Sequence, residues 1–372
     1  MRRRDFRTFP PSLFYNAEVK SWDIIIIGGG IIGLSLALAL RKRGATVLVV
    51  ERGEPGGEAS HAAGGMLVDC GLETPAALQP LATASARMYP EFAKDLEFDS
   101  GVQVDLRDQG TIMFPSSEHV HQEPALPATS PSAVSLAELE PALAETDRPA
   151  FYLKERSVDP RALSTAAWKG AKHRGVDFSS GDEVTSIAII DGHAVGIKTI
   201  KTVFHAAKVV NCAGAWSGQI GPHAFPTRPV KGQMLCLLMP SRALLKHVVR
   251  SPEAYLIPRS DGRLLVGATV EEAGFDKRTD IATIQRLHRA AVDLVPELRN
   301  AKILEDWAGL RPGTPDALPI LGPTATPGYY VATGHFRDGI LLAPITAEVM
   351  AAVIEGHTPE YDLSPFSTER FH

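Results

Sequence analysis

The chain has 372 residues, of which 44% are hydrophobic and 22% are charged, as is typical of folded globular proteins. Its net charge of -5 argues against nucleic acid or an anionic membrane surface as the main partner. Cys70, Cys212 and Cys236 have the spacing of neither a disulfide framework nor a metal site, which predicts a reducing, cytoplasmic location and no metal. No apolar run in the sequence has the length of a membrane span.

The first residues of the chain are basic. The arginine run at residues 2–4, followed by Phe6, resembles a twin-arginine export signal, which would continue into an apolar segment. Pro10 and other polar or helix-breaking residues follow here instead. We therefore predict that residues 1–20 form a flexible N-terminal arm.

The most informative stretch of the sequence follows this arm. The β-branched run at residues 23–27 predicts a buried parallel strand. Gly28, Gly30 and Gly33 then form a G-x-G-x-x-G turn. In this motif the first glycine permits a tight turn, the second allows close approach of a pyrophosphate, and the third allows close helix–strand packing.

The residues after the turn complete the motif. A helix is predicted over residues 34–43, and a second apolar strand is predicted over 46–50. Glu51 follows at the position where an acid accepts hydrogen bonds from the ribose of an adenine dinucleotide. The order of strand, turn, helix, strand and acid favours dinucleotide binding over an unrelated glycine-rich turn, but it fits NAD and FAD equally.

Two further segments are candidates for contact with the same ligand. Residues 52–66 are rich in small side chains and leave the strand end that carries Glu51, so we expect them beside the cofactor rather than in a mobile surface loop. Residues 208–216 predict a buried strand with small residues at its end. Close approach at Gly214 would place it beside the cofactor, although a plain strand-to-loop turn fits as well.

The other predicted elements alternate between helices and short strands. They are a helix over 75–99, strand-like residues 111–114, an exposed loop over 115–131, a capping box at Ser135–Glu138, a helix over 161–173 capped by Asp159, a hairpin over 184–200, strands at 233–238, 254–257 and 264–269, a helix capped by Asp280, and a strand at 328–333. The last strand precedes a glycine-containing loop and an apolar helix, which would return the chain to the first sheet. We find no internal repeat.

Four sequence motifs together indicate a family. They are GGGIIG at 28–33, GRLLVGAT at 262–269, WAGLRPGTPD at 307–316 and GHFRDGILLAP at 334–344. With them, the chain resembles the glycine oxidases, which serve thiazole formation in thiamine biosynthesis and belong to the D-amino-acid oxidase family of FAD flavoproteins. The resemblance extends over residues 22–350.

The resemblance implies an α/β fold in which a Rossmann-like FAD-binding domain is interleaved with an α+β substrate domain built on an antiparallel sheet. The segments assigned to the FAD-binding domain are 21–100, 157–227 and 306–372, and those assigned to the substrate domain are 101–156 and 228–305.

The resemblance also implies which residues contact FAD. Ile31 and Ile32 would offer backbone contacts to the diphosphate, Glu51 would bind the ribose, Val184 would contact the adenosine end, and 335–341 would face the flavin ring. Together with the glycine turn and Gly214, the full set of predicted cofactor contacts is Gly28, Gly30, Ile31, Ile32, Gly33, Glu51, Arg52, Ala59, Ser60, Gly64, Gly65, Met66, Val184, Gly214, His335, Phe336, Arg337, Asp338, Gly339, Ile340 and Leu341.

Three residues match substrate contacts of the family. Arg311 would bind the substrate carboxylate, since a planar guanidinium fork suits that group. Tyr255 would support it, unless it is an ordinary buried strand tyrosine. Arg337 would contact the substrate or stabilise the anionic reduced flavin. Hydride transfer to flavin requires no acid or base if the amine arrives neutral, so we assign no acid–base residue and expect the loop to position His335.

The sequence departs from the best-known glycine oxidase in the expected substrate region. Arg250, Glu253 and Ala254 stand where that relative is more aromatic and carries a histidine, and Val270 stands where it has a methionine. This difference would favour sarcosine or a larger D-amino acid over glycine.

The sequence also bears on whether FAD is bound covalently. His61 and the residues after it resemble a segment that carries covalent FAD in sarcosine and dimethylglycine dehydrogenases, but Ser60 replaces the tryptophan of that segment. No cysteine follows Cys236 to serve as in monomeric sarcosine oxidase. We therefore predict non-covalent FAD.

Three functions are compatible with these residues. The first is an oxidase that uses O2 to convert glycine, sarcosine or small D-amino acids to glyoxylate or a 2-oxo acid, ammonia and H2O2. The second is a D-amino-acid or sarcosine dehydrogenase with another electron acceptor. The third is a non-catalytic flavin-binding protein, against which Arg311 argues. A homo-oligomer and a thiazole synthase as downstream partner are further expectations.

Overall fold

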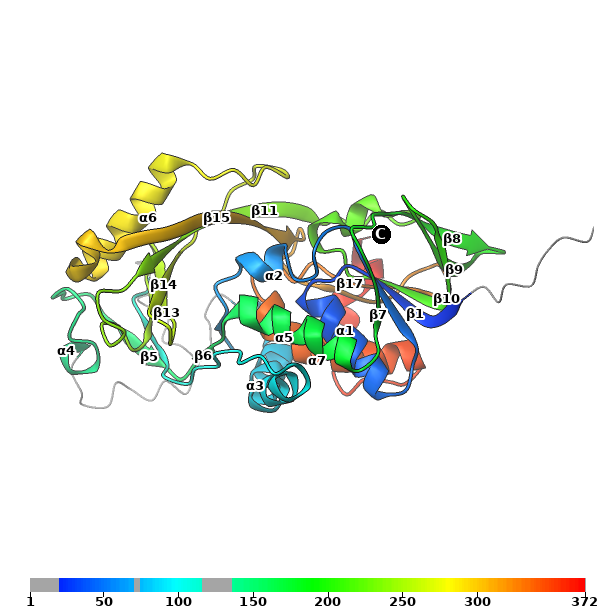
Figure 1. Cartoon of the computed structure of the whole chain (residues 1–372), viewed down its shortest axis with the longest axis horizontal. Helices are drawn as coiled ribbons and strands as arrows, with labels where there is room; N and C mark the ends of the chain where they lie inside the picture. The colour runs from blue at the N-terminus through cyan, green and yellow to red at the C-terminus, as the bar shows by residue number, and fades with distance from the viewer. Residues whose placement is uncertain (1–19, 70–73, 116–135, 372) are drawn as a thin grey trace, which may run out of the picture.

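The computed structural model describes residues 20–69, 74–115 and 136–371. The predicted arm except Lys20, most of the predicted loop 115–131 and Ser135 of the predicted capping box lie outside these residues. The described chain forms two large sheets, each with its own helices, that lie side by side, and one two-stranded sheet (Figure 1).

The first sheet is largely parallel and has the order β16-β17-β10-β1-β2-β7, with the β8–β9 hairpin attached to β10. Its strands are β1 (Ser21–Ile27), β2 (Val47–Glu51), β7 (Asp177–Ser180), β8 (Val184–Ile190), β9 (His193–Thr199), β10 (Val203–Asn211), β16 (Ile320–Pro323) and β17 (Tyr329–Thr333). Because β1, β2, β10 and β17 are parallel, the loops after these four strands meet at one edge.

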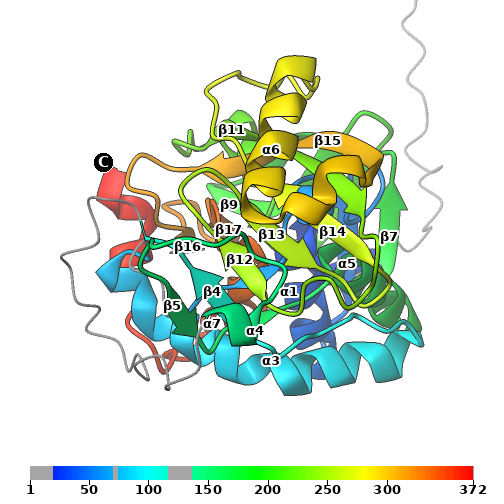
Figure 2. The same cartoon turned by 90° about the vertical axis from the view of Figure 1, so that its left-hand side faces the viewer.

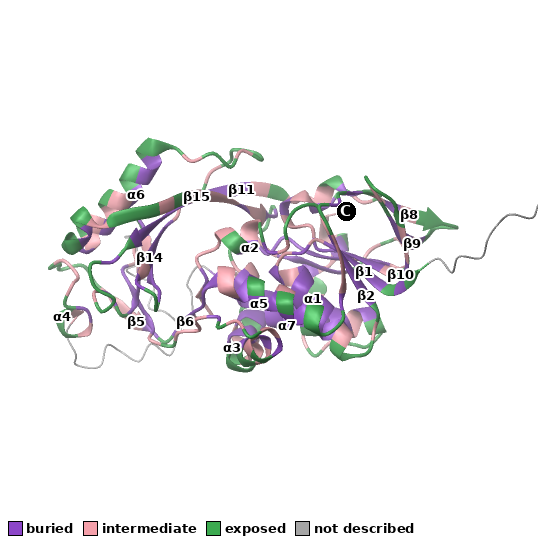
Figure 3. Ribbon diagram, in the orientation of Figure 1, coloured by how far each residue is buried: buried purple, intermediate pink, exposed green. Residues whose placement is uncertain are grey.

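Four helices pack together on one side of the parallel sheet (Figure 1). They are α1 (Ile31–Lys42), α3 (Gln79–Ser100), α5 (Pro160–His173) and α7 (Gly339–Glu355), with α3 beneath α5 and α7 in this view. Helix α1 is the most enclosed, as the buried colour in Figure 3 shows, because it packs between the sheet and the other helices. The predicted cap of α5 is confirmed, since Asp159 accepts hydrogen bonds from the backbone N–H groups of Arg161 and Ala162.

The second sheet has the order β15-β11-β14-β13-β12-β4-β5. Its strands are β4 (Thr111–Met113), β5 (Phe151–Leu153), β11 (Arg228–Leu238), β12 (Val248–Arg250), β13 (Tyr255–Pro258), β14 (Arg263–Gly267) and β15 (Lys302–Gly313). The sheet is antiparallel, as predicted, except for the parallel pair β12–β4. Helix α6 (Ile281–Leu294) covers its outer face and begins at Asp280, whose side chain accepts from the Thr283 N–H (Figure 2).

The remaining elements are short. They are α2 (Ala59–Ala62), α4 (Leu136–Leu139), the strand pair β3 (Met66–Leu67) and β6 (Arg156–Ser157), and the 3-10 turns η1 (Ala76–Leu78), η2 (Gly214–Gln219), η3 (Pro296–Asn300), η4 (Ser364–Phe366) and η5 (Thr368–Phe371).

The two large sheets confirm the predicted fold class, while the predicted domain boundaries stay predictions. Strand β15 pairs with β11 from Lys302 to Gly313, so the boundary predicted between residues 305 and 306 falls inside a continuous strand. A new sequence motif begins near this position, but the backbone hydrogen bonds between β11 and β15 continue through it. The long strands β11 and β15 therefore reach from the second sheet toward the first (Figure 1).

Candidate active site

A cavity of about 740 Å³ lies where the carboxyl edge of the parallel sheet meets β11, β13, β14 and β15. The residues predicted to bind cofactor or substrate line this cavity, with two exceptions, Gly33 and Leu341. Side chains at successive helix positions point in different directions, so Ile340 faces the cavity whereas Leu341 turns into the hydrophobic core. Leu341 therefore lies outside the cavity lining, and its contact with the cofactor stays a prediction.

The glycine turn after β1 is crowded by backbone on two sides. Gly28 has a φ of +104°, and a Cβ there would lie 2.5 Å from the carbonyl oxygen of Cys212. A Cβ at Gly33 would lie 2.1 Å from the carbonyl oxygen of Gly28, so Gly33 has the helix–strand packing role that the motif predicts. Both positions require glycine, and the start of α1 is thereby held against the cavity.

Glu51 and Ser60 organise the backbone around this turn. The Glu51 carboxylate accepts from the N–H groups of Gly29 and Gly53, both at 2.8 Å, and it lines the cavity. The Ser60 hydroxyl accepts from the N–H of Ile31 at 2.9 Å. The Ile31 amide is thus already engaged within the protein, and a diphosphate bound there would share or replace this bond.

A cluster of side chains, of which only Arg52 was a predicted cofactor contact, covers one end of the cavity. We call Arg52, Glu58, Trp216, Phe275 and Lys277 the interdomain cluster. The Arg52 guanidinium lies 3.6 Å from the centroid of the Trp216 ring and 2.9 Å from Glu58. Glu58 also pairs with Lys277 at 3.1 Å, and the rings of Trp216 and Phe275 are 5.2 Å apart.

Two signals for this cluster were present in the sequence, since Arg52 is a predicted cofactor contact and Trp216 ends the predicted apolar strand segment. Phe275 and Lys277 belong to the loop between β14 and α6, almost sixty residues further along the chain, and no local pattern relates them to Trp216.

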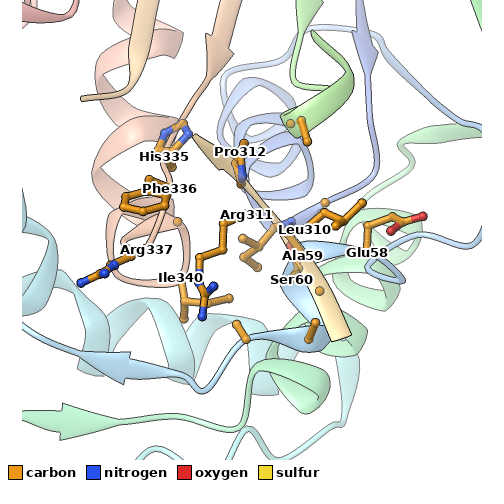
Figure 4. A pocket seen from close by; sticks show the side chains of 18 of the residues that line it. Glu58, Ala59, Ser60, Leu310, Arg311, Pro312, His335, Phe336, Arg337 and Ile340 are labelled. Atoms are coloured by element: carbon orange, nitrogen blue, oxygen red, sulfur yellow. Dashed lines mark hydrogen bonds between the residues drawn. The ribbon is translucent and has the colours of Figure 1, made fainter. Parts of the chain in front are cut away.

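Arg311 projects from β15 into the opposite end of the cavity. Its guanidinium lies across β11, where a Cβ at Gly232 would be only 2.3 Å from Nη1, and Nη1 donates to the carbonyl oxygen of Thr269 at 3.1 Å. Figure 4 shows the side chain reaching from β15 toward Ile340 at the start of α7, with Glu58 on the far side. The guanidinium also interacts with the Tyr255 hydroxyl, so both side chains border the same end of the cavity.

Tyr255 lies next to Arg311. Its ring packs over Gly267, where a Cβ would be 2.9 Å from the hydroxyl oxygen, and its hydroxyl is 3.7 Å from the Met234 sulfur. Burial raises the pKa of Tyr255, and the positive charge of Arg311 opposes the rise. The hydroxyl therefore stays protonated at neutral pH and can donate to a carboxylate that Arg311 holds.

The loop between β17 and α7 supplies the third wall. His335 is 3% exposed, its Nε2 lies 3.1 Å from the Thr346 hydroxyl, and burial lowers its pKa to about 3, so the ring is neutral. Arg337 follows it, with its guanidinium 5.3 Å from the Phe336 ring centroid (Figure 4). Helix α7 begins at Gly339, and its N-cap Asp338 and its first two residues line the cavity, so the positive end of the helix borders it.

The structure also bears on covalent flavin attachment, reactive cysteines and metal binding. His61 is exposed and its neighbours, rather than His61 itself, line the cavity. Cys212 and Cys236 are buried and free, and burial raises the pKa of the Cys212 thiol, which borders the cavity. Among the described residues, no group of three or more His, Cys, Asp or Glu side chains could hold a metal ion. Within the same residues, no helix is both long and apolar enough to span a membrane.

The cavity fits a dinucleotide with a redox-active ring. Crowded glycines, an acid at the end of β2 and the N-terminus of α1 suit an adenine dinucleotide. Two arginines and the N-terminus of α7 at the other end suit a ring that becomes negatively charged on reduction. These features define a flavin-dependent oxidoreductase.

Comparison with known proteins identifies the family. Residues 23–353 match the DAO family, described as FAD dependent oxidoreductase, and the chain belongs to this family. Its cofactor is FAD. The chain is 33% identical to glycine oxidase from Geobacillus kaustophilus over 94% of its own length and 97% of that protein. The crystal structure of glycine oxidase from that organism matches with a TM-score of 0.87, covering 94% of this chain and 99% of the other.

Two other relatives widen the comparison. The bifunctional protein ThiO/ThiG of Trichormus variabilis is 35% identical over 94% of this chain, which spans only 55% of that protein's length. The hydrogen cyanide synthase subunit HcnC of Pseudomonas aeruginosa is 31% identical over 95% of this chain and 97% of that subunit.

Proposed function

We propose that the protein oxidises glycine, and also sarcosine or small D-amino acids, with O2 as electron acceptor. The products would be glyoxylate or another 2-oxo acid, ammonia and H2O2. The observation that carries this proposal is Arg311, which extends into the cavity beside Tyr255 and opposite the glycine turn. The likeness to the glycine oxidase of Geobacillus kaustophilus supports it.

The proposed role of the protein residues is to position the substrate. Arg311 would bind the carboxylate through charge-assisted hydrogen bonds, and Tyr255 would donate a further one. FAD supplies the hydride acceptor and the transfer of electrons to O2. His335 is neutral and bonded to Thr346, which supports the assignment of no acid–base residue. The substrate amine would therefore have to bind in its neutral form.

The substrate end of the cavity also bears on specificity. Arg250, Glu253 and Ala254 line it beside Tyr255, and Val270 lines it from the loop after β14. These are the positions at which the sequence departs from the best-known glycine oxidase. They support a preference for a substrate larger than glycine.

Anaerobic mixing with single substrates tests the proposal. We expect the flavin absorbance to bleach with glycine, sarcosine, D-alanine or D-proline, and not with L-amino acids. Admitting air should restore the absorbance and release one H2O2 for each substrate oxidised. A flavin that none of these amines bleaches would refute the proposal.

The second candidate is a dehydrogenase of D-amino acids or sarcosine that passes electrons to another acceptor. The similarity to HcnC favours keeping it, because that protein is named as a subunit of a hydrogen cyanide synthase and not as an oxidase. Bleaching by an amine, followed by slow reoxidation in air and rapid reoxidation by a quinone or dye, would select this candidate.

The setting of the reaction is proposed on similar grounds. ThiO/ThiG proteins join a region similar to this chain to a further region, which supports a role in thiazole formation with thiazole synthase as a downstream partner. A cytoplasmic location and a homo-oligomer complete the proposal. Denaturation should release the flavin from the polypeptide, because His61 lies outside the cavity lining.

A further inference from the structure

Arg259 is the largest fully buried side chain of the described chain, with 1% of its surface exposed. It follows β13 and lies behind the cavity wall, outside the cavity lining. Burying a guanidinium is unfavourable unless carboxylates and hydrogen-bond acceptors surround it. The partners of Arg259 therefore decide whether its charge has a purpose beyond packing.

These partners compensate the charge only in part. Asp159 lies near, but it already accepts from Arg263 at 2.6 Å and from the first turn of α5. Asp105 accepts from the backbone and hydroxyl of Ser260. The Nε and Nη1 atoms of Arg259 have no hydrogen-bond partner. Burial lowers the pKa of Arg259 to about 10, so the side chain remains charged at neutral pH.

The remaining donor atom makes one specific contact. Nη2 of Arg259 donates to the carbonyl oxygen of Gly64, and both Gly64 and Gly65 line the cavity. In a trans peptide the N–H points opposite to the preceding C=O. Because the Gly64 carbonyl points back at Arg259, the Gly65 N–H points to the cavity side. Gly65 has a φ of +77°, and a Cβ there would lie 3.2 Å from Nη2.

The Gly64–Gly65 segment also packs against side chains of β13, independently of the Arg259 hydrogen bond. Tyr255, Ile257 and Arg259 alternate along the chain and face the same two glycines. A Cβ at Gly64 would lie 2.8 Å from Cδ1 of Ile257 and 3.4 Å from Cε2 of Tyr255. An apolar residue at position 259 could continue this contact, and replacing a buried charge by an apolar group often leaves stability unchanged or improves it.

We propose that Arg259 is a positioning residue for the cofactor, acting through the Gly64–Gly65 peptide. It directs the Gly65 N–H into the cavity and places a positive charge behind that wall. Both effects stabilise a bound ring that gains negative charge on reduction. The inference depends on FAD binding, which the family establishes, and is independent of which amine is oxidised.

The test compares three variants. Arg259→Met removes the charge and the donor, and Arg259→Gln removes the charge but retains an amide donor. Arg107→Met is the matched control, because Arg107 also donates to a backbone carbonyl, that of Pro258 at the end of β13, at 2.8 Å, but Pro258 does not line the cavity. For each variant we would measure the FAD reduction potential, the FAD dissociation constant and the thermal unfolding of the FAD-free chain.

We expect Arg259→Met to shift the reduction potential to a more negative value and to raise the dissociation constant about tenfold or more. Arg259→Gln should shift the potential in the same direction with a smaller loss of affinity. Arg107→Met should change only thermal unfolding. If Arg259→Met does not fold, Arg259→Gln decides alone. Wild-type potential and affinity in the variant that folds would overturn the proposal and leave Arg259 a structural residue.

Discussion

The two sheets contribute to the cavity in different ways. The parallel sheet offers backbone: glycines that admit no Cβ, amides fixed by Glu51 and Ser60, and the start of a helix. The antiparallel sheet offers long side chains, with Arg311 and Tyr255 on its cavity face. Backbone recognises a feature that many ligands share, here the dinucleotide. Side chains recognise what distinguishes one substrate from another.

The largest effect is expected where backbone space is lost at the parallel sheet. Gly28→Ala would force a Cβ to 2.5 Å from the Cys212 carbonyl at a φ of +104°. We expect a loss of about 3–5 kcal/mol in the free energy of unfolding and protein purified without FAD. FAD content and urea unfolding measure both.

Gly44→Ala is the control for this change. Its φ is +94°, but no atom lies within 4 Å of its Cβ position. It should therefore lose only about 1 kcal/mol and keep FAD. If both variants lost the same free energy of unfolding and the same FAD content, backbone strain alone would explain the effect. The proposed difference between the two sheets would then be wrong.

The next effect concerns a side chain of the antiparallel sheet. Arg311→Ala should raise KM roughly 10–150-fold while FAD stays bound, because a charge-assisted hydrogen-bond pair is lost. Steady-state kinetics and the flavin spectrum test this. Arg228→Ala is the control, since Arg228 lies on β11 and pairs with Glu272 but does not line the cavity. An unchanged KM for Arg311→Ala would contradict the carboxylate role.

A pH effect is expected in the loop that joins the parallel sheet to α7. The folded-state pKa of His335 is about 3, against an ordinary value of 6.5. Below about pH 6.5 the unfolded chain binds a proton that the folded chain does not. Stability should therefore fall by about 1.4 kcal/mol per pH unit from this group as pH decreases toward 3.

His335→Asn isolates this contribution. Urea unfolding between pH 7 and pH 4 should show a shallower decline for the variant than for the wild type. Parallel declines would mean that the buried His335 side chain becomes protonated without unfolding.

The smallest effect concerns the ion pair that links the sheets through the interdomain cluster. Lys277→Ala removes a half-exposed pair with Glu58 and should lower the free energy of unfolding by about 0–1 kcal/mol. Lys42→Ala removes the ion pair with Asp95, which joins α1 to α3, and should lower the free energy of unfolding by a similar amount. A loss above about 2 kcal/mol for Lys277→Ala alone would show that the two sheets depend on this pair.

Much of the fold was predictable because its signals are local. The run before Gly28, the cap at Asp159 and the turn at Asp191 each involve neighbouring residues, and all three elements are present. The interdomain cluster and Arg259 were not predictable. Trp216 meets Phe275, and Arg259 meets Gly64, only after the two sheets come together.

The sequence by itself determined the dinucleotide turn, the family motifs and a set of candidate site residues, most of which line the cavity. Glycine spacing and the residues at strand ends can be interpreted from neighbouring residues alone. The tertiary structure alone decided which side chains lie behind and across that lining. It placed Leu341 in the core, carried β15 through the predicted boundary and buried Arg259 against the Gly64 carbonyl. How far a side chain is buried, and how far its charge is compensated, depends on residues distant in sequence that meet only in the folded protein. A short sequence segment therefore cannot predict either property.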